Sequence, residues 1–418
     1  MPKKKSAAKT RSEKKRPVRR SAQEQRRVRL ARRRALFSLL ALLGVAAIVF
    51  FLVLRNSSEI SIAENGIGSL FSRGQSVFTG AANGVKQFTQ RWRDYDRLEA
   101  EYDTVIRPYW QQFRVRTPKK FWFQLLCNEA NEFSPRYIPD DLWFRDIVPH
   151  YNNLLFAKAL QDKCLHSVFF PDMKRPETVL KRVAGVFYDD DLSLLTREEA
   201  LARCHGVGRV IIKPSVGTGQ GNGIRFFDTD EITDGELLDI FRAVGPDFII
   251  QKKLVQHPVL AALNPNSVNT IRVITFLHEN KVHVLTSFLR VGGGDNEVDN
   301  TSQGGYKSTI GPDGRLHELG MSKIGGYWKF TDAYPNGLRF RDVVIPSYDR
   351  ILETVTAHAA KMSHFRLLGW DIAVDEQGDP VMIEYNVIPA QGHGTGGPLF
   401  GDLTDQVLEE VYGRRDRR

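Results

Sequence analysis

The hydrophobic pattern after residue 117 predicts a domain of mixed helices and strands. Short apolar runs alternate with clusters of glycine, asparagine and aspartate, which is typical of strands joined by turns. We expect strands at 176–186, 210–214, 224–227, 248–251, 269–274, 284–291, 370–374 and 380–386, with 269–274 and 284–291 forming one hairpin. Residues 197–204, after the N-cap Thr196, have helical spacing. Residues 151–168 also predict a helix, whose apolar side is formed by Leu154, Leu155, Ala159, Leu160 and Cys164.

The first residues of the chain follow other patterns. Residues 1–34 form a basic arm, which is typical of disorder. Residues 35–54 are apolar, carry no charge and are long enough to cross a bilayer once. A secretory signal peptide is the alternative, but the basic region is too long for one, and no small-residue cleavage site follows cleanly. We therefore expect a retained single-pass transmembrane helix.

Residues 55–116 combine a linker rich in glycine and serine with an amphipathic helix. Its apolar residues recur at spacings of three and four, with Glu99 as the exception, and the helix is expected to end near Pro108. These residues are Val85, Phe88, Trp92, Tyr95, Tyr102, Ile106 and Tyr109. Two alternatives remain open for the 85–109 helix, which are packing on its own domain and self-association through a coiled-coil stalk.

The net charge of +10 comes from the basic arm. Residues 1–35 hold 16 Lys or Arg against Glu13 and Glu24, so the rest of the chain carries about −4. The folded part therefore has no basic excess that would indicate a nucleic acid partner. The three cysteines lack C-x-x-C spacing and predict neither a disulfide framework nor a zinc site.

The stretch 370–386 predicts a hairpin that carries a metal site. If Gln377 and Gly378 form a two-residue turn, Asp371 lies directly opposite Glu384, and Asn386 projects to the same face. Two carboxylates and an amide oxygen suit Mg²⁺, which fills its other positions with water and nucleotide phosphates. A surface hairpin with a polar outer face is the alternative.

A glycine loop follows the predicted strand 210–214. The strand runs into Lys213, and residues 215–223 then contain Gly217, Gly219, Gly221 and Gly223. Because glycine lets backbone N–H groups approach phosphate oxygens, this loop is a candidate phosphate flap, with Lys213 as a point charge. It is not a Walker loop, since no G-K-[ST] sequence closes it.

Later strands and loops supply further polar candidates. Gln251 and Leu254 lie at a strand end that can present backbone groups to an adenine edge. Arg272 and Arg290 lie within the two strands of the 269–291 hairpin, where an arginine marks either a sheet edge or a site. Asn300 belongs to a polar loop. The remaining candidates, for an acceptor pocket, are His257, His393 and the glycine-rich residues 392–397, for which a flexible loop is the alternative.

In this order, the motifs resemble the ATP-grasp superfamily. The segments IIKPSVGTGQGNGI, FIIQKKL, NTIRVIT, DNTSQGG, GWDIAV and MIEYN follow one another within residues 162–411. Their order is similar to that of the sugar-transfer-associated and α-L-glutamate-ligase-related branch. The resemblance implies an α+β fold in which two subdomains grip ATP between antiparallel sheets, here behind an N-terminal transmembrane helix. It divides the folded part into residues 117–205, an ATP-grasp domain at 206–412 and a basic tail at 413–418.

The resemblance also assigns roles to individual residues. Lys163 and Lys213 match the two lysines that bind ATP, and the flap residues Ser215, Gly217, Gly219 and Gly221 match the cover over its phosphates. Gln251 and Leu254 stand at the adenine hinge, where the family commonly has Glu-x-x-Leu. Asp371, Glu384 and Asn386 match the metal ligands. Arg272, Arg290 and Asn300 match residues that neutralise the transferred phosphoryl group or line the same cleft.

These roles imply a carboxylate–amine ligase that uses ATP and Mg²⁺, with Mn²⁺ as the alternative metal. A carboxylate would be activated as an acylphosphate and then attacked by an amine. The expected membrane anchor extends this to a cell-envelope polymer or its precursor as substrate. A phosphotransferase of the same fold and a non-catalytic membrane scaffold with a nucleotide site are the alternatives.

Two opposing arguments predict on which side of the membrane the folded domain lies. The positive-inside rule places residues 1–35 in the cytoplasm and the domain on the other side. The supply of ATP argues for a cytoplasmic domain. We adopt the cytoplasmic placement as the prediction.

Overall fold

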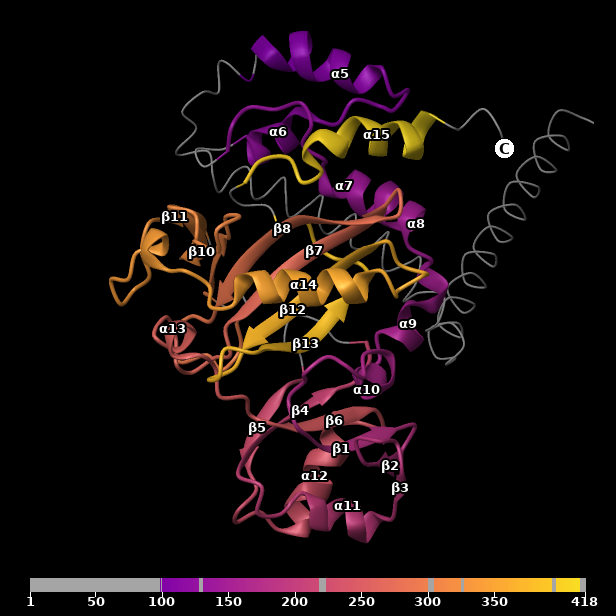
Figure 1. Cartoon of the computed structure of the whole chain (residues 1–418), viewed down its shortest axis with the longest axis vertical. Helices are drawn as coiled ribbons and strands as arrows, with labels where there is room; N and C mark the ends of the chain where they lie inside the picture. The colour runs from indigo at the N-terminus through magenta and orange to yellow at the C-terminus, as the bar shows by residue number, and fades with distance from the viewer. Residues whose placement is uncertain are drawn as a thin grey trace, which may run out of the picture. The chain divides into compact units, whose positions relative to one another are not determined.

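Two antiparallel sheets frame the part of the chain that the computed structural model describes, which is residues 98, 100–127, 131–217, 223–299, 304–324, 327–392 and 396–413. Figure 1 shows the small sheet at the bottom and the large sheet above it. Within these ranges no helix has the length and apolar character needed to cross a membrane. The predicted arm, the predicted span 35–54 and most of the predicted 85–109 helix lie outside the described residues.

The small sheet has six strands in the order β3-β2-β1-β6-β4-β5. Their bounds are Leu194–Leu195, Val186–Tyr188, Thr178–Val183, Phe248–Lys252, Arg209–Pro214 and Arg225–Asp228. Helices α11 (Arg197–Arg203) and α12 (Asp234–Val244) each begin with a threonine capping box, and they cover one face. Because side chains alternate along a strand, Lys213 and Gln251 project from the opposite face. The strand and helix predictions for this region are confirmed, except that residues 176–186 comprise β1, a turn at residues 184–185 and the first residue of β2.

The large sheet has seven strands in the order β11-β10-β9-β8-β7-β12-β13. Their bounds are Tyr327–Thr331, Gly320–Ile324, Tyr306–Thr309, Lys281–Val291, Thr270–His278, Leu367–Val374 and Pro380–Asn386. Helix α14 (Tyr348–Ala359) buries Ile351 and Val355 against apolar residues of one face, which include Val273, Leu289 and Trp370. The predicted hairpin of 269–274 with 284–291 is confirmed as β7 with β8.

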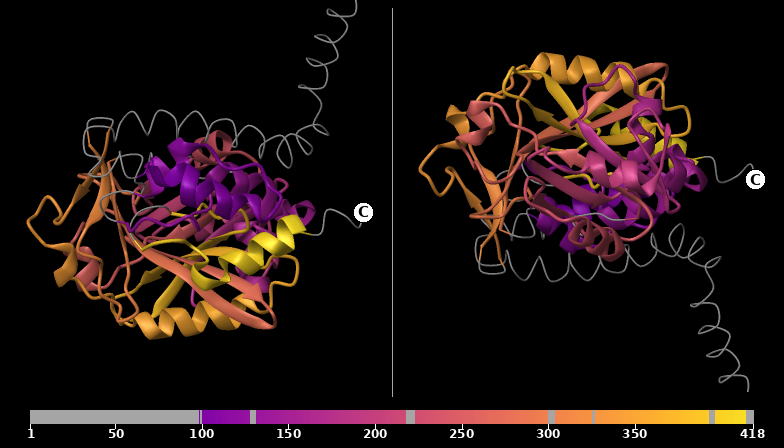
Figure 2. Two further views of the ribbon diagram at one scale, coloured as in Figure 1. Left: turned by 90° about the horizontal axis from the view of Figure 1, so that it is seen from above. Right: turned by 90° about the horizontal axis from the view of Figure 1, so that it is seen from below.

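The other face of the large sheet is shared between a helical layer and a polar half. A second apolar cluster joins Phe276 of β7 and Leu367 of β12 to Trp143 and Phe400. The layer contains α5 (Arg107–Gln111), α6 (Lys120–Leu126), α7 (Asp140–Leu142), α8 (Val148–Tyr151) and α15 (Thr404–Leu408), with π-helical turns at Tyr102–Ile106, Trp143–Ile147 and Glu409–Gly413. Figure 2 shows these helices over the strands from above. The rest of the same face, around Asp371, carries the charged residues described below.

The described part of the predicted 85–109 helix belongs to this layer. Tyr102, Ile106 and Trp110 are buried in its apolar cluster. The helix does not end at Pro108, because proline at the first turn of α5 needs no N–H partner and α5 continues to Gln111. Packing on its own domain is therefore the alternative that holds for these residues. Self-association through the helix has no support from them.

The prediction of one helix over residues 151–168 was wrong. In chain order, the segment contains a 3-10 turn at Leu154–Phe156, α9 (Ala157–Leu160), a second 3-10 turn at Lys163–Leu165 and α10 (His166–Phe169). The side chains of Asn153 and Asp162 each accept a backbone N–H two residues later, which starts a new turn at each place. Of the expected apolar side, only Cys164 is buried, and Leu155 is 90% exposed.

The hairpin of β12 and β13 has the predicted pairing, although its turn differs. Asp371 lies opposite Glu384, which confirms the prediction. Near the turn, Val374 pairs with Pro380, and Asp375 N–H donates to the carbonyl of Asp379, so the loop has three residues instead of two. A bulge after Asp371 restores the register. Gly378 takes the left-handed conformation, with φ of +85°, that such a loop needs.

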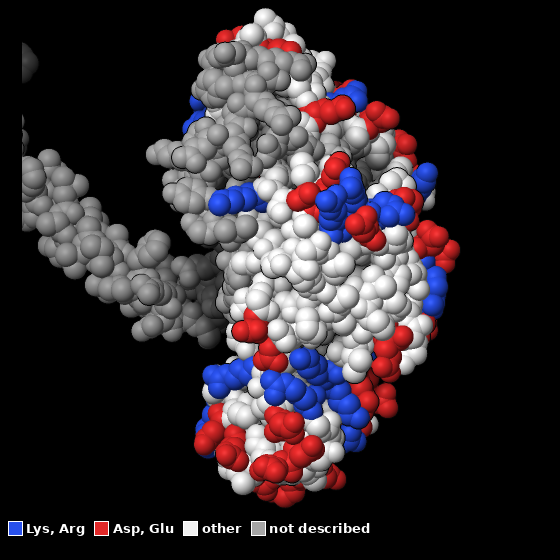
Figure 3. Space-filling view, turned by 90° about the vertical axis from the view of Figure 1, so that its left-hand side faces the viewer, with Lys and Arg blue, Asp and Glu red and all other residues white. Residues whose placement is uncertain are grey.

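Three connections complete the fold. Helix α13 (Pro258–Ala261) precedes β7, a 3-10 turn at Phe340–Asp342 precedes α14, and another at Gly401–Leu403 precedes α15. His257 acts as the N-cap of α13, accepting the Val259 N–H at 3.2 Å, and so has a local structural role. His393 lies outside the described residues. The face in Figure 3 carries both acidic and basic side chains. The ion pairs of the described residues include Arg209–Glu297 (2.9 Å) and Lys252–Glu177 (2.7 Å).

Candidate active site

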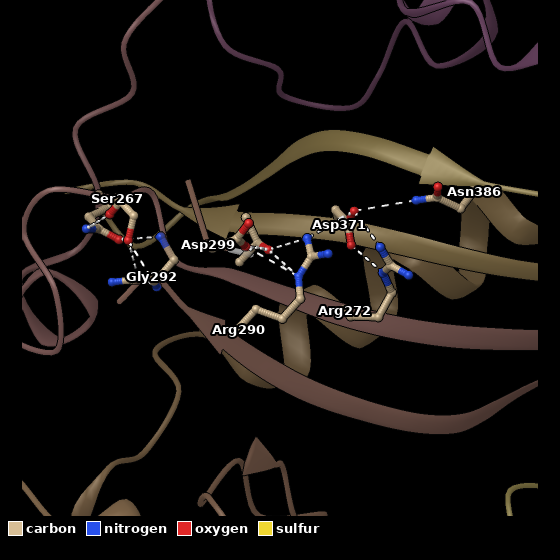
Figure 4. Close-up of polar contacts among 10 residues, drawn as sticks. Ser267, Arg272, Arg290, Gly292, Asp299, Asp371 and Asn386 are labelled. Atoms are coloured by element: carbon tan, nitrogen blue, oxygen red, sulfur yellow. Dashed lines mark hydrogen bonds and ion pairs between the residues drawn. The ribbon is translucent and has the colours of Figure 1, made fainter. Parts of the chain in front are cut away.

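The register of four neighbouring strands gathers charged side chains on the polar half of the large sheet. Asp371 of β12 pairs with Glu384 of β13 on one side and with Arg272 of β7 on the other. Arg290 of β8 lies opposite Thr270, two residues before Arg272. Directly opposed side chains share a face, so these groups all point the same way. We call Arg272, Arg290, Asp371 and Glu384 the charged row, and Figure 4 shows the first three of them beside one another.

Asp371 is the centre of this group and is only 1% exposed. Arg272 holds the Asp371 carboxylate with two parallel hydrogen bonds. Its Nε donates to Oδ1, and its Nη2 donates to Oδ2 at 2.8 Å. Arg290 Nη2 lies 3.1 Å from the same Oδ2. Asn386 Nδ2 is 3.5 Å away, which places the amide on this face but is long for a hydrogen bond. Both arginines thus face the predicted metal ligand.

Arg290 also contacts residues that the sequence alone did not assign to the site. Its guanidinium donates to Thr270 Oγ1 at 2.7 Å and lies 3.3 Å from Asp299 Oδ2. Burial raises the pKa of Asp299, and the charge of Arg290 opposes that rise. The predicted site residue Asn300 follows directly and lies outside the described residues.

Glu384 faces the lysines of the nucleotide side. Lys163 Nζ lies 3.3 Å from its Oε2. Burial alone would raise the pKa of Glu384, but the charges of Lys163 and Lys213 and those of the two arginines outweigh it and lower the pKa to about 2. The carboxylate is therefore ionised at neutral pH, as a metal ligand must be.

Lys213 is a buried lysine on the open face of the small sheet. Burial and the nearby charge of Lys163 lower its pKa to about 8, against the opposing effect of Glu384. Ser215 lies two residues after Lys213, and its carbonyl accepts the Lys163 N–H at 3.1 Å. This hydrogen bond holds together the two segments that carry the lysines. Of the other predicted flap residues, Gly217 is described, with φ of +75°, whereas Gly219 and Gly221 lie outside the described residues.

A cleft lies between the open face of the small sheet and β13. Its lining is rich in cations and comprises Lys163, His166, Ser167, Arg175, Thr178, Lys181, Asp190, Lys213, Ile249, Gln251, Met382 and Ile383. Two buried polar atoms of this lining, His166 Nε2 and Gln251 Oε1, lack a hydrogen-bond partner among the described residues. An unsatisfied buried polar group costs about 1–3 kcal/mol, so a polar ligand or a water molecule would stabilise each of these atoms. A nucleotide base and its phosphates fit this donor and acceptor set.

Two backbone donors of the predicted adenine hinge are used within the small sheet. The N–H groups of Lys252 and Lys253 donate to the carbonyls of Glu177 and Arg209, at 2.9 and 3.0 Å, so they are not available to a base. Leu254 does not line the cleft. Gln251 does, and its neighbours there include the fully buried Lys181, which ion-pairs with Asp190 at 3.0 Å and which the sequence did not reveal.

A buried polar network fixes the start of β7 beside the charged row. Asn269 Nδ2 donates to the carbonyls of Leu260 and Asn264 at 2.8 and 2.9 Å, and Gln256 accepts the Asn269 N–H. Ser267 Oγ accepts from Gly292 N–H at the end of β8, which is also visible in Figure 4. Asn269 and Gln256 therefore position Thr270 and Arg272 and do not belong to the charged row.

The sequence model of sugar-transfer associated ATP-grasp domains matches residues 145–393, more than half of the chain. The chain belongs to the sugar-transfer associated ATP-grasp family. The two antiparallel sheets are those of the ATP-grasp fold, as the family resemblance implied. No curated protein sequence matches the chain.

Solved structures similar to this ATP-grasp chain include three ligase or carboxylase proteins. They are the ATP-grasp ligase PsnB with its minimal precursor (14% identity, TM-score 0.33, covering 61% of this chain and 60% of PsnB), the L-amino acid ligase from Bacillus licheniformis (14%, 0.27, 55% and 40%) and the biotin carboxylase domain of Hydrogenobacter thermophilus 2-oxoglutarate carboxylase with MgADP (14%, 0.36, 64% and 49%). The chain thus spans about 40–60% of the length of these proteins.

The donor set of the charged row fits a magnesium ion shared with a nucleotide. The described residues contain no group of three or more His, Cys, Asp or Glu side chains that could hold a metal alone. Asp371 and Glu384 supply two carboxylates and Asn386 an amide on one face. Mg²⁺ is commonly held by one or two carboxylates together with phosphates, so this incomplete protein set is the expected one.

Nucleotide affinity is predicted to depend on the charge of Lys213. The ammonium form, present below pH 8, attracts phosphate, and it is lost as the pH rises through the pKa of about 8. We expect the Kd for Mg·ATP to weaken about tenfold between pH 7 and 9. Calorimetric titration at several pH values measures this.

Two variants test the origin of that pH dependence. Lys213→Arg keeps a charge at every pH used and is expected to flatten the profile, whereas Lys213→Met weakens binding throughout. An unchanged slope in both variants would assign the titration to another group.

Proposed function

We propose that this chain is a membrane-anchored ligase that uses ATP and Mg²⁺ to activate a carboxylate as an acylphosphate and to join it to an amine. The observation that carries the proposal is the gathering of two carboxylates and four cations around one point of the large sheet. Asp371 contacts Arg272 and Arg290, and Glu384 contacts Lys163, with Lys213 nearby.

The residues would divide the work of phosphoryl transfer among them. Asp371, Glu384 and Asn386 would hold Mg²⁺. When bound, the ion would neutralise charge on the β- and γ-phosphates. Lys163 and Lys213 would pair with phosphate oxygens, which releases Glu384 from its ion pair. Arg272 and Arg290 would stabilise the charge that spreads over the γ-phosphoryl oxygens during transfer.

The proposed reaction has two steps. A substrate carboxylate oxygen attacks the γ-phosphorus, the bond from that phosphorus to the ADP oxygen breaks, and an acylphosphate and ADP form. The amine then attacks the acyl carbon, loses a proton and expels phosphate, which leaves an amide. Water must be kept from the acylphosphate, and we assign this to residues 215–223, part of which lies outside the described residues.

A trapping experiment tests the acylphosphate step and separates it from phosphoryl transfer to a hydroxyl group by an enzyme of the same fold. The full chain is given ATP, Mg²⁺ and a mixture of carboxylates from acetate to hexanoate, with or without hydroxylamine. A ligase is expected to form hydroxamate in amounts equal to ADP, because hydroxylamine attacks an acylphosphate as the amine would. A stable phosphorylated product without hydroxamate would favour the phosphotransferase.

Matched variants control this experiment. Glu384→Gln is expected to lower ADP formation about 100-fold, the usual effect of removing one electrostatic contact to the transition state. Glu376→Gln makes the same chemical change at an exposed position of the same hairpin and is expected to have no effect.

We further propose that residues 35–54 anchor the enzyme in a membrane, with its domain in the cytoplasm and a cell-envelope polymer or precursor as substrate. The apolar length of the segment and the need for ATP support this placement. A reporter enzyme that works only in the cytosol, fused after Arg418, is expected to be active. Activity of a reporter that works only across the membrane would contradict the placement and would favour the charge rule.

A further inference from the structure

The segment after β8 brings a third carboxylate to the charged row. Residues 292–299 leave the strand that carries Arg290 and return Asp299 to the same arginine. Asp299 Oδ2 lies 3.3 Å from Arg290 Nε, and the two side chains are 17% and 22% exposed. Figure 4 shows Asp299 on one side of Arg290 and Asp371 on the other. Arg290 therefore lies between two acids from different parts of the chain.

Thr270 fixes how Asp299 meets the arginine. Its hydroxyl donates to Asp299 Oδ2 and accepts from Arg290 Nε and Nη2, at 3.1 and 2.7 Å. A hydroxyl has one hydrogen to donate and two lone pairs, so these contacts use its whole capacity. Thr270 is itself 5% exposed and lies in β7. The three side chains thus form a closed set of contacts that restrains the direction of the guanidinium.

Backbone packing holds the 292–299 loop in place. A Cβ atom at Gly292 would lie 2.9 Å from the Val298 carbonyl oxygen, so the loop closes on itself only because this residue is glycine. Asn264, which is 5% exposed, donates from Nδ2 to the Gly292 carbonyl at 2.8 Å. The position of Asp299 is therefore set by packing as well as by charge.

The same loop contacts the small sheet. Glu297 Oε1 lies 2.9 Å from Nη2 of Arg209 in β4 and 3.7 Å from Nζ of Lys253, which directly follows β6. Lys213 lies on the same strand as Arg209. The loop thus joins the strand that carries Lys213 to the charged row.

Asp371 and Asp299 have different tasks under the proposed function. Arg290 Nη2 lies 3.1 Å from Asp371 Oδ2, but that carboxylate is assigned to the metal. A carboxylate shared with Mg²⁺ attracts an arginine less strongly. Arg290 then depends on Asp299 and Thr270 for its position, and a misplacement of about 1 Å can cost about 100-fold in rate.

We propose that Asp299 is a positioning residue that holds Arg290 toward the γ-phosphate of the bound nucleotide. The proposal rests on the proposed function and assigns Asp299 no contact with the nucleotide or the metal. Charge alone would give Asp299 the opposite effect, because its carboxylate repels a phosphate. The direction in which its removal changes triphosphate binding therefore separates positioning from simple charge.

Calorimetric titration with two nucleotides tests the proposal. A non-hydrolysable ATP analogue and ADP are each titrated with Mg²⁺ into the full chain, and ADP is the internal control because it lacks the γ-phosphate. Asp299→Asn is expected to weaken binding of the analogue about tenfold and to change binding of ADP by less than about twofold. Asp295→Asn makes the same chemical change at an exposed position of the same loop and is expected to change neither.

Two further variants identify the partner through which Asp299 acts. Thr270→Val removes the bridging hydroxyl and is expected to weaken the analogue but not ADP. In the Arg290→Lys background, Asp299→Asn is expected to have no further effect, because lysine lacks the planar fork that Asp299 holds.

Three results overturn the proposal. They are equal or tighter binding of the analogue by Asp299→Asn, the full tenfold loss in the Arg290→Lys background, and unchanged binding of the analogue by Thr270→Val. The last result decides alone if melting curves show that Asp299→Asn does not fold.

The two nucleotides also separate this failure from failure of the proposed function. If both bind with Mg²⁺ and the variants do not change their ratio of affinities, the ligase proposal stands and the positioning role falls. If the unmodified chain binds neither nucleotide, the ligase proposal is contradicted, and the positioning role that rests on it falls as well.

Discussion

The contact between Asp371 and Arg272 is the interaction on which the rest of the site depends. It joins two strands that are adjacent in space but 99 residues apart in sequence. The carboxylate is almost fully buried, and its desolvation is offset only because two arginines hold it. Replacing such a pair with apolar residues is often neutral or stabilising, so stability alone gives weak reason to keep it. Its place beside Glu384 and the nucleotide cleft gives a functional reason.

The charges of the site are arranged for a ligand that carries negative charge. Four cations, Lys163, Lys213, Arg272 and Arg290, face three acids, Asp299, Asp371 and Glu384. Both arginines contact Asp371, Arg290 also contacts Asp299, and Lys163 contacts Glu384. When a nucleotide and its metal bind, these side chains would change partners. The lysines would then pair with phosphates, and the carboxylates would bind the metal. The exchange is expected at Lys213, whose pKa is lowered, and at His166 and Gln251, which each have a buried atom without a hydrogen-bond partner in the described part of the chain.

The sequence predicted most of the strands and the opposition of Asp371 and Glu384, because both depend on alternation over a few residues. The predicted two-residue turn was wrong. Asp371 still lies opposite Glu384, because the bulge after Asp371 shifts the register of the two strands by one residue. The 151–168 segment misled for a local reason, since Asn153 and Asp162 each cap a new turn and so break the single helix that the apolar spacing favours. The roles of Asp299, Lys181 and His166 depend on how distant strands meet. No spacing along the chain could indicate those contacts, and Lys163 was found only through the family resemblance.

The central claim is that Asp371 and Glu384 bind nucleotide through a metal, and calorimetric titration tests it most directly. A non-hydrolysable ATP analogue is titrated, with and without Mg²⁺, into the full chain and into the Asp371→Asn, Glu384→Gln double variant, with melting curves to confirm that both are folded. The account predicts Mg²⁺-dependent binding that the double variant loses. Equal affinity in the folded double variant, or affinity that does not depend on Mg²⁺, would contradict it.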